Sequence, residues 1–495
     1  MEINFAPLKP KNPSRLRSIF AHPRLNQGLL AIAIVASLTS VVLSAMTYFR
    51  GQHSLAPLAT NDPAALSAPP AAQLTSPPSR VLDGNDLDSY VANLIGETKV
   101  EGELVVGLPV FDREAVLDDH QERIDDTFAI QANMRERAGF WFDVYTKYDA
   151  NRRIIHHTRF PWIIYKVVDV TPIIEAPTPK FRWMRNMKAD AFVKKETDKI
   201  LAAIRTLAKG KSEKQMNETE LVVAEALSKL GGVKKQARLA IGETRVQMGQ
   251  RNFFRSGLEV SNRYLSAMER IFRAQKLPTE LTRIPFVESS FNKHATSKVG
   301  ASGIWQFMGN TGRKFMIVND SIDERRSPFK ATEAAARLLK ENHLILSRKW
   351  PLAVTAWNHG PAGIRRASKA AGSKDLGEII SRYNSRTFDF ASSNFYSEFL
   401  GALYAEKYQN EIFGDLQREA TLDVQVVRVP RSIRASEIIR VSGLSEDEFL
   451  ALNPELQLGL KTRIPAGFRL HIPAHVSGEV ERLLAARDSR PIKKS

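Results

Sequence analysis

The sequence predicts a mostly α-helical protein in which a transmembrane helix and an α+β region precede a helical domain, and a small βααβ module follows. An uncharged apolar stretch near the N-terminus is long enough to span a bilayer, and apolar residues recur at helical spacing in several segments after residue 250. β-Branched runs bounded by turn residues occur before residue 170 and near the C-terminus. The segments that we expect are a cytoplasmic tail (1–27), a transmembrane anchor (28–49), a Pro/Ala-rich linker (50–86), an N-terminal α+β region (87–249), a helical domain (250–417), a βααβ module (420–476) and a basic tail (477–495).

The composition narrows the classes of partner and of chemistry. The chain has 495 residues and a formal net charge of +17, which favours an anionic partner such as an acidic polymer or a membrane surface. Zinc-finger spacing, an aromatic RNA-binding signature and a basic helix followed by heptads are all missing from the sequence, so nucleic acid is not an expected partner. Cysteine is absent, which excludes disulfides, thiol catalysis and cysteine metal sites.

The stretch from Gly28 to Phe49 reads as an uncleaved transmembrane helix. It has no charged residue, and at ~1.5 Å per residue it spans a bilayer core of ~30 Å. A cleaved signal peptide is the competing interpretation, but its apolar core is normally about 7–15 residues long, and Leu43-Ser44-Ala45 is a poor cleavage site. The basic residues that precede the stretch place the N-terminus in the cytoplasm; they are Lys9, Lys11, Arg15, Arg17 and Arg24.

The segment after the anchor should act as a tether. Between Gly51 and Ser79 it is rich in Pro, Ala and Ser, and Asp62 is its only Asp, Glu, Lys or Arg. Such a composition cannot bury a core, so we expect an extended chain that gives the folded body reach from the membrane.

The region from 87 to 249 carries no recognisable chemistry. Aromatic residues between Phe140 and Tyr148 have helical spacing, Ile154-Ile155 and the run from Trp162 to Val168 read as strands, and charged helical patterns extend from Met187 to about Gln250. His156 and His157 are adjacent, so in a strand they point to opposite faces and do not form a joint metal site. A structural or partner-binding role is the simplest interpretation.

Glu288 is the first candidate for chemistry. The segment that begins at Leu277 reads as a helix with Pro278 in its first turn, and Glu288 falls near its end beside Phe286 and Phe291. Apolar surroundings and a helix C-terminus both disfavour an ionised carboxylate. A carboxyl that stays protonated near neutral pH suits cleavage of a glycosidic bond, although a lone glutamate is more often a surface residue.

Two polar features follow Glu288. The segment from Ser297 to Gln306 is a loop whose glycines allow tight turns, and the Gln306 amide can donate and accept hydrogen bonds, which suits an N-acetyl group. A helix should run from Ser327-Pro328 to Leu346, and another from Pro351 to a polar tip at 357–360. That tip is either a sugar contact or an ordinary helix C-cap.

Four motifs, in the same order along the chain, resemble those of a known family. The strings "VESSFN", "TSKVGASGIWQFM", "AVTAWNHGPAGI" and "NFYSEFLGALYA" resemble the motifs of the lysozyme-like catalytic domain of lytic transglycosylases, of the soluble-lytic-transglycosylase and goose-lysozyme-like type. The resemblance covers about a third of the chain. It implies a lysozyme-like α-helical catalytic domain at 250–417.

The resemblance also implies roles for individual residues. Glu288 matches the single catalytic acid/base, and Ser289 is expected to be structural. Trp357 stands where the family has Tyr, which keeps a ring but puts the hydrogen bond of the hydroxyl in doubt. The positions that match substrate-binding residues are Ser297, Gln306, Met308, Ala356, Trp357, Asn358 and Tyr396.

The implied reaction is cleavage of peptidoglycan glycan strands without a second carboxyl. Ordinary glycosidases use two carboxyls, whereas no motif here supplies another, and the loop residues Asp320, Asp323 and Glu324 are expected to be solvated. In the family, the acid/base protonates the leaving oxygen and then takes a proton from the C6 hydroxyl of N-acetylmuramic acid, which closes a 1,6-anhydro ring. No cofactor or metal is expected. The implied location is the bacterial inner membrane with the catalytic body in the periplasm, and no protein partner is identified.

The C-terminal segment from Leu422 to Ala474 is similar to a LysM module, a βααβ sugar binder. The similarity rests on two short helical patterns between strands and on Asn453-Pro454. Pro430-Arg431-Ser432 replaces the usual Gly-Asp-Thr, so a degenerate module that packs on the catalytic domain is an open alternative.

Two other functions stay open at the level of sequence. A hydrolytic muramidase would need a positioned second carboxyl or a trapped water. A catalytically silent peptidoglycan-binding scaffold is the other, and the intact set of motifs around Glu288 argues against it.

Overall fold

The computed structural model describes residues 111–486, all of which belong to one compact unit. The expected cytoplasmic tail, membrane anchor and linker lie outside the described residues. Within residues 111–486, no helix combines the length and the apolar character that crossing a membrane requires. The described residues form three hydrophobic cores, one each in a helical body, a sheet with covering helices and a C-terminal module.

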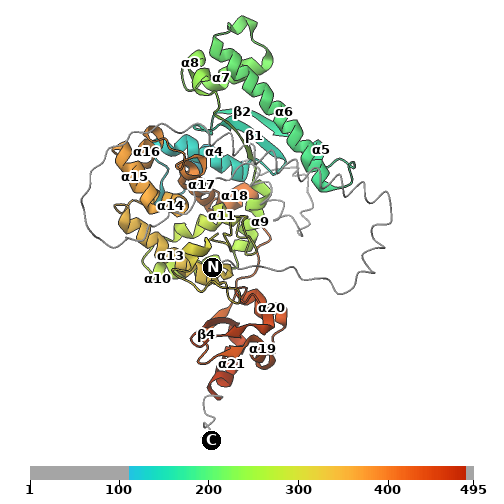
Figure 1. Ribbon diagram of the computed structural model, residues 1–495, viewed down its shortest axis with the longest axis vertical. Coiled ribbons are helices and arrows are strands. Elements are labelled where there is room, and N and C mark those ends of the chain that lie inside the picture. Colours follow the sequence, from blue (N-terminus) through green and yellow to red (C-terminus); the bar gives the residue numbers. More distant parts are fainter. Residues whose placement is uncertain (1–110, 487–495) are drawn as a thin grey trace, which may run out of the picture. The chain divides into compact units, whose positions relative to one another are not determined.

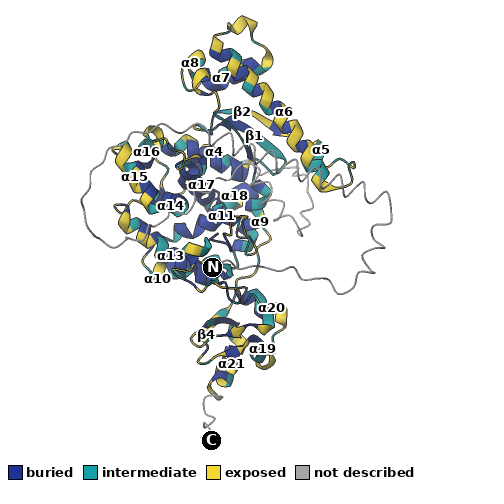
Figure 2. Cartoon of the chain, in the orientation of Figure 1, coloured by how far each residue is buried: buried dark blue, intermediate teal, exposed yellow. Residues whose placement is uncertain are grey.

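The helical body holds the largest core, and its buried residues concentrate in α4, α14 and α17 (Figures 1 and 2). Fully buried aromatic rings such as Phe254, Phe286 and Phe399 supply much of its apolar area. The helices of this body are α3 (Arg113–Leu117), α4 (Arg135–Thr146), α9 (Arg251–Ser261), α10 (Leu265–Ala274), α11 (Ile284–Ser289), α12 (Gly309–Gly312), α13 (Pro328–Ile345), α14 (Trp350–His359), α15 (Pro361–Ala371), α16 (Leu376–Arg382), α17 (Phe390–Lys407) and α18 (Gln409–Phe413).

Helices α4 and α17 form the most extensive helix pair of the body. Asn394 of α17 accepts hydrogen bonds from Arg137 Nη1 at 2.9 Å and from Trp141 Nε1 at 3.1 Å. A Cβ at Gly401 would lie 2.7 Å from the backbone nitrogen of Phe142, so glycine permits this close approach. The core of the helical body therefore begins upstream of residue 250, where the catalytic domain was expected to start.

A three-stranded antiparallel sheet carries the second core. Strands β1 (Arg152–His157), β2 (Ile164–Asp169) and β3 (Thr244–Met248) lie in the order β2-β1-β3. The first two strands confirm the prediction, but the helical pattern expected up to about Gln250 is wrong at β3, because pairing with β1 overrides a weak local preference. The helices of this part are α5 (Thr171–Ile174), the long α6 (Arg182–Lys209), α7 (Glu218–Ser228) and α8 (Val233–Leu239).

The two adjacent histidines point to opposite sides of β1, as predicted. His156 packs against Phe140 and Phe390 of the helical body, whereas His157 packs against Phe160. Across residues 111–486, no group of acidic or histidine side chains is arranged to hold a metal ion.

The C-terminal module has the expected order of strand, two helices and strand. Its elements are β4 (Val424–Arg428), β5 (Ile433–Arg434), α19 (Ala435–Ser442), α20 (Glu446–Leu452), β6 (Arg463–Ile464), β7 (Arg469–Pro473) and α21 (Ala474–Ala486), and β4 pairs with β7 in antiparallel register. The tail expected from residue 477 is helical as far as Ala486, because Val480 and Leu484 are buried in the module's core one turn apart. The likeness to a LysM module remains a prediction.

Candidate active site

Glu288 lies on the last turn of a short helix. The helix expected from Pro278 is divided: a 3-10 turn covers Thr279–Arg283, and α11 follows with Glu288 next to its last residue. Ser290 then ends the helix in the left-handed conformation, with φ of 48°. This end lies close to α9, since a Cβ at Gly257 would be 2.9 Å from the Ser290 carbonyl oxygen. The Glu288 residue is only 5% exposed, which matches its predicted apolar surroundings.

Trp357 of α14 donates a hydrogen bond from its indole Nε1 to Oε1 of Glu288 at 3.0 Å. The ring is held against Trp305 and Phe307, with centroid distances of 5.5 and 5.1 Å. The indole at this position, where the family has Tyr, therefore supplies a hydrogen-bond donor to Glu288.

The loop 295–308, called the substrate loop below, is fixed to α11 and to the core. Ser289 Oγ donates to the Ile304 carbonyl at 2.8 Å, which gives Ser289 the structural role expected for it. Trp305 is fully buried, stacks on Phe272 and donates to Thr332 Oγ1 at 2.8 Å. Trp305 is therefore a core residue that anchors the middle of the loop.

Gln306 is buried and uses its donors within the substrate loop. With φ of 47°, it donates from Nε2 to the carbonyls of Ala295 and Gly303 at 3.0 and 2.9 Å. Its Oε1 is buried and has no hydrogen-bond partner in the described structure. The sequence suggested that this amide would both donate and accept at a ligand, but in this structure its donors are used within the loop, and only the buried acceptor lacks a partner.

The other two loop positions differ in what they contact. Ser297 Oγ accepts from the backbone nitrogen of Ala301 at 2.9 Å, so this hydroxyl stabilises the loop turn. Met308 is half-buried and directly precedes α12.

The end of α14 joins the start of α17 through a polar group. Ser392 Oγ donates to Asn358 Oδ1 at 3.0 Å and lies 3.0 Å from Nδ1 of His359. This contact fixes the orientation of the Asn358 amide and leaves its Nδ2 donors for a ligand. Ala356 is buried within α14, where a larger side chain would disturb the core.

Tyr396 is buried on α17, and α17 packs against α11. Burial raises the pKa of its phenol well above the ordinary value, so the hydroxyl stays protonated. Neutral Tyr396 can donate a hydrogen bond but cannot act as a base near neutral pH.

Sequence reasoning missed Tyr145 and Glu398. Tyr145 of α4 is buried, and burial followed by the charges of Glu398 and Glu288 raises the pKa of its phenol. Helical periodicity identified Tyr145 only as part of an apolar face. Nothing in the sequence signals that Tyr145 lies within electrostatic range of two carboxyls from different helices.

The loop carboxylates were expected to be solvated, and this is wrong for Asp323 and Glu324. Asp323 is buried and forms a two-point ion pair with Arg325 at 2.7–2.8 Å. Glu324 lies 3.1 Å from the buried Lys330, whereas Asp320 is exposed as expected. The sequence could not show this, because the burial of this loop depends on its contact with the C-terminal module, through Ile322 and Asp323.

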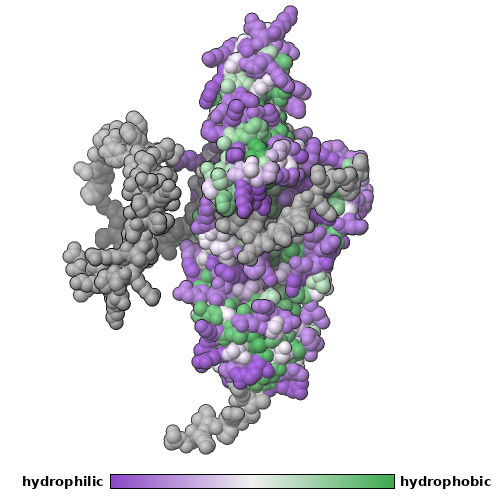
Figure 3. Space-filling view, turned by 90° about the vertical axis from the view of Figure 1, so that its right-hand side faces the viewer, coloured by the Kyte–Doolittle hydropathy of each residue, from purple (hydrophilic) through white to green (hydrophobic). Residues whose placement is uncertain are grey.

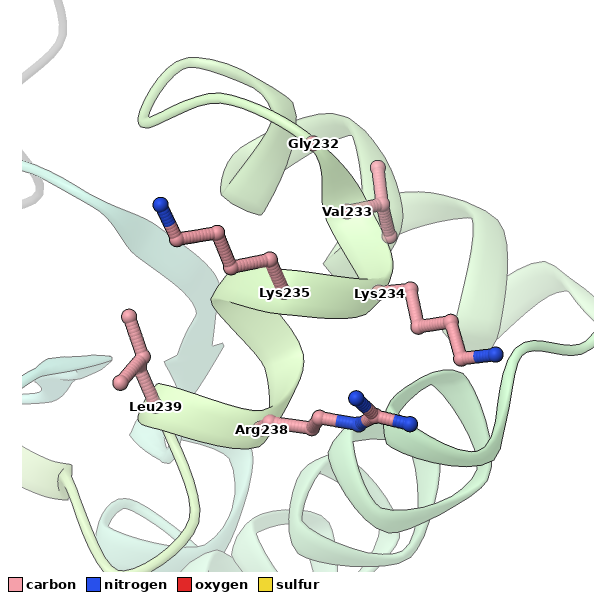
Figure 4. Close-up of a pocket in the computed structure, with 6 residues that line it drawn as sticks. All are labelled: Gly232, Val233, Lys234, Lys235, Arg238 and Leu239. Carbon is pink, nitrogen blue, oxygen red and sulfur yellow. The ribbon is translucent and has the colours of Figure 1, made fainter.

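A surface depression of about 580 Å³ lies on α8, away from these residues. Lys234 and Arg238 extend to one side of the helix and Lys235 to the other, so the cations do not converge on one point (Figure 4). On the face shown in Figure 3, hydrophilic residues cover most of the visible surface, with hydrophobic residues in smaller areas between them. The geometry around Glu288 is therefore the better candidate for chemistry.

Residues 268–380 match the transglycosylase SLT domain. The matched range contains Glu288, the substrate loop and Trp357, and it ends before Tyr396. The expected family resemblance is thereby confirmed over a range that holds three of the four motifs, and the SLT domain coincides with the part of the helical body that carries the candidate acid.

Two curated relatives are similar to about a fifth of the chain. A stretch of 98 residues is 35% identical to membrane-bound lytic murein transglycosylase D of Escherichia coli (strain K12), and covers 20% of this chain and 22% of that protein. The same values hold for the protein of that name from Escherichia coli O6:H1. The match thus spans about a fifth of the length of these relatives.

Solved structures of two lytic transglycosylases are also similar. The 70 kDa soluble lytic transglycosylase of Escherichia coli has a TM-score of 0.26 at 17% identity, over 48% of this chain and 37% of that chain. Lytic transglycosylase Slt of Pseudomonas aeruginosa has a TM-score of 0.26 at 18% identity over the same shares.

Proposed function

We propose that this protein is a peptidoglycan lytic transglycosylase that cleaves the bond between N-acetylmuramic acid and N-acetylglucosamine. The observation that carries the proposal is the buried Glu288, oriented by the indole of Trp357 inside a match to the SLT domain. The names of the curated relatives, lytic murein transglycosylases, support this substrate class.

Trp357 determines which oxygen of Glu288 carries the proton. An indole nitrogen donates and cannot accept, so Oε1 is an acceptor in both protonation states of the carboxyl. In the acid form the proton is therefore on Oε2. The same atom, Oε2, therefore donates the proton first and accepts a proton later.

The reaction then proceeds with one carboxyl in two steps. Glu288 transfers its Oε2 proton to the glycosidic oxygen as the bond from that oxygen to C1 of N-acetylmuramic acid breaks. The carboxylate next takes the proton from the C6 hydroxyl of the same sugar, whose oxygen bonds to C1. The product has a 1,6-anhydro ring, water is not consumed, and Glu288 is returned to its acid form.

The substrate loop and α14 supply the polar groups for the sugar. The unpartnered Oε1 of Gln306 suits the N–H of an acetamido group, and the Nδ2 of Asn358 suits a carbonyl or hydroxyl oxygen. The buried hydroxyl of Tyr396 adds a neutral donor. We place Ser297, Met308 and Ala356 in the supporting wall of the same site.

The location and the accessory parts belong to the same proposal. The predicted anchor at 28–49 holds the chain in the bacterial inner membrane, and the body from 87 onward acts in the periplasm. The word "membrane-bound" in the names of the curated relatives supports this placement. The module at 420–476 is LysM-like, in agreement with its strand–helix–helix–strand order.

A hydrolytic muramidase is the second candidate, because Glu398 is a second carboxyl in the neighbourhood. Its charge and that of Glu288 act on the same buried Tyr145. If Glu398 activated a water molecule, the product would have a reducing end. In that case Glu398→Gln would abolish cleavage, whereas the proposed mechanism leaves the chemistry of the C6 hydroxyl independent of Glu398.

The test combines a Glu288→Gln variant with product analysis. Gln is nearly isosteric and cannot donate and recover a proton, so cleavage should fall by at least about 100-fold while the melting temperature stays close to that of wild type. Purified peptidoglycan digested by wild type should give ends lighter by one water than those of hydrolysis. Reducing ends from wild type would replace the proposal with the muramidase, and undiminished cleavage by folded Glu288→Gln would refute the site.

A further inference from the structure

The loop 319–326, called the linking loop below, belongs structurally to the C-terminal module. Ile322 is buried in the core of that module and forms a β-bridge with Leu456. The backbone nitrogen of Asp323 donates to the Glu455 carbonyl at 2.8 Å, and that of Gln457 donates to the Ser321 carbonyl at 3.0 Å. The module thus binds this loop as it would an additional short strand.

The other side of the linking loop holds the substrate loop. Arg325 donates from Nη1 to the carbonyls of Gly300 and Phe307 at 2.7 and 3.0 Å, and its two-point pair with Asp323 fixes the guanidinium. At Gly303, a Cβ would lie 1.9 Å from the Arg325 carbonyl, so only glycine allows this approach. The two loops therefore pack backbone to backbone.

A buried ion pair fastens the module to the helical body beside this contact. Lys330 of α13 donates to Glu455 at 2.6 Å, and the two side chains are 2% and 0% exposed. Lys330 also lies 3.1 Å from Glu324 and over the ring of Phe468. Loss of Lys330 would leave the buried Glu455 carboxylate without compensation, so the docked arrangement is strongly specified.

We propose that the C-terminal module positions the substrate loop, with Arg325 as the positioning residue through which it acts. The order of contacts is Glu455, the linking loop, Arg325 and then the carbonyls of Gly300 and Phe307. In the same substrate loop, the Ile304 carbonyl accepts a hydrogen bond from Ser289, the neighbour of Glu288. This role rests on the proposed transglycosylase function and differs from glycan binding by the module.

The first test is Arg325→Lys in the full-length chain, which keeps the charge and loses the planar fork. Backbone amides in 295–308 should exchange with deuterium at least about 10-fold faster, while those of α4 and α17 are unchanged. The rate of peptidoglycan cleavage at saturating substrate should fall by at least about 10-fold, since small misplacements of a site cost this much or more. The melting temperature should change little.

The matched control is Arg469→Gln. Arg469 also joins the module to α13, through a two-point pair with Glu333 at 2.6–2.8 Å, and Glu324 of the linking loop acts on it only through its charge. Its removal should leave both amide exchange in 295–308 and cleavage near wild type. Glu455→Gln keeps the backbone carbonyl that accepts from Asp323 and removes only the carboxylate that pairs with Lys330, so its effects should have the same direction as those of Arg325→Lys and be smaller.

A double variant, Lys330→Met with Glu455→Leu, covers the case in which Glu455→Gln does not fold. It replaces the buried pair with apolar side chains of similar volume, so the module should stay docked and both the slow exchange and the cleavage rate should be retained. The proposal would be overturned if the Arg325→Lys variant kept the wild-type rate of amide exchange in 295–308 and the full rate of cleavage. Amide exchange decides the positioning role even if wild type proves unable to cleave peptidoglycan, so the two failures are distinguishable.

Discussion

At the scale of single residues, the contact between Trp357 and Glu288 ties the orientation of the acid to the core. The indole donates to Glu288 while its ring packs against Trp305, which is itself buried and bonded to Thr332. A tyrosine hydroxyl could rotate and accept a hydrogen bond, whereas an indole cannot. Trp at this position therefore restricts the carboxyl to one hydrogen-bonding arrangement.

Trp357→Phe should keep most of the packing and remove the donor. Hydrogen bonds to charged groups contribute about 1.5–3 kcal/mol, so the rate of peptidoglycan cleavage should fall by about 10- to 100-fold. Trp350→Phe is the matched control, because Trp350 starts the same helix and stacks on His343 instead. Equal rates for the two variants would show that the indole of Trp357 does not orient Glu288.

The sequence predicted the identity of these residues better than their contacts. Glu288 was placed at a helix end, which the structure confirms. The use of both Gln306 donors within the loop could not be predicted, because it depends on the folded shape of the loop, in which Gln306 has a positive φ and its amide reaches the carbonyls of Ala295 and Gly303. Arg325 was missed because its hydrogen-bond partners, the carbonyls of Gly300 and Phe307, belong to another loop.

At the scale of elements, most patterns predicted the element that forms, and two short elements were missed. Strand β1 agrees with its β-branched pattern. Helices α13 and α14 agree with their apolar periodicity and with the proline at the start of each. Strand β3 and the 3-10 turn before α11 were missed. In β3, Arg245 and Gln247 alternate with apolar residues in a window too short to separate from the helices around it.

Strand β1 makes a specific prediction about acid stability. Burial lowers the pKa of His156 to about 3, and the charges of Arg245 and Arg137 act in the same direction. Between the ordinary pKa of 6.5 and this value, the unfolded chain binds a proton that the folded chain does not, so the free energy of unfolding decreases as the pH falls. From pH 7 to pH 5 this loss should reach at most about 2 kcal/mol.

Thermal melting of wild type and His156→Phe at the two pH values measures this contribution. The variant should lose less stability than wild type between pH 7 and pH 5, because phenylalanine cannot take up a proton. His157 and His471 have similarly lowered pKa values and will leave part of the pH dependence in place. An identical loss in both proteins would mean that His156 does not contribute.

At the scale of the whole molecule, the helical body is not confined to the range with the motifs. Residues from 116 to 154 share one hydrophobic core with residues from 254 to 413. The family motifs lie in the second range alone, so sequence reasoning had no reason to include α4. Its aromatic residues indicated a helix, and the partner of that helix is about 250 positions away.

A fragment of residues 250–417 should therefore fail to fold cooperatively. Without α4 it exposes the face of α17 around Phe399 and leaves the buried Asn394 oxygen without Arg137 and Trp141. A fragment of residues 111–486 should give a single sharp thermal transition by circular dichroism. A cooperative transition in the shorter fragment would show that α4 is dispensable.

The pairing of α4 with α17 also sets an order of events during synthesis. Arg137 and its partner Asn394 are 257 positions apart. At a synthesis rate of about 5–20 residues per second, α4 waits on the order of ten seconds or more before α17 exists. During that interval Trp141 lacks Phe390 and Asn394, its partners on α17 in the folded protein. The nascent chain must therefore be protected from aggregation and proteolysis around α4 until only about the last fifth of the chain remains to be made.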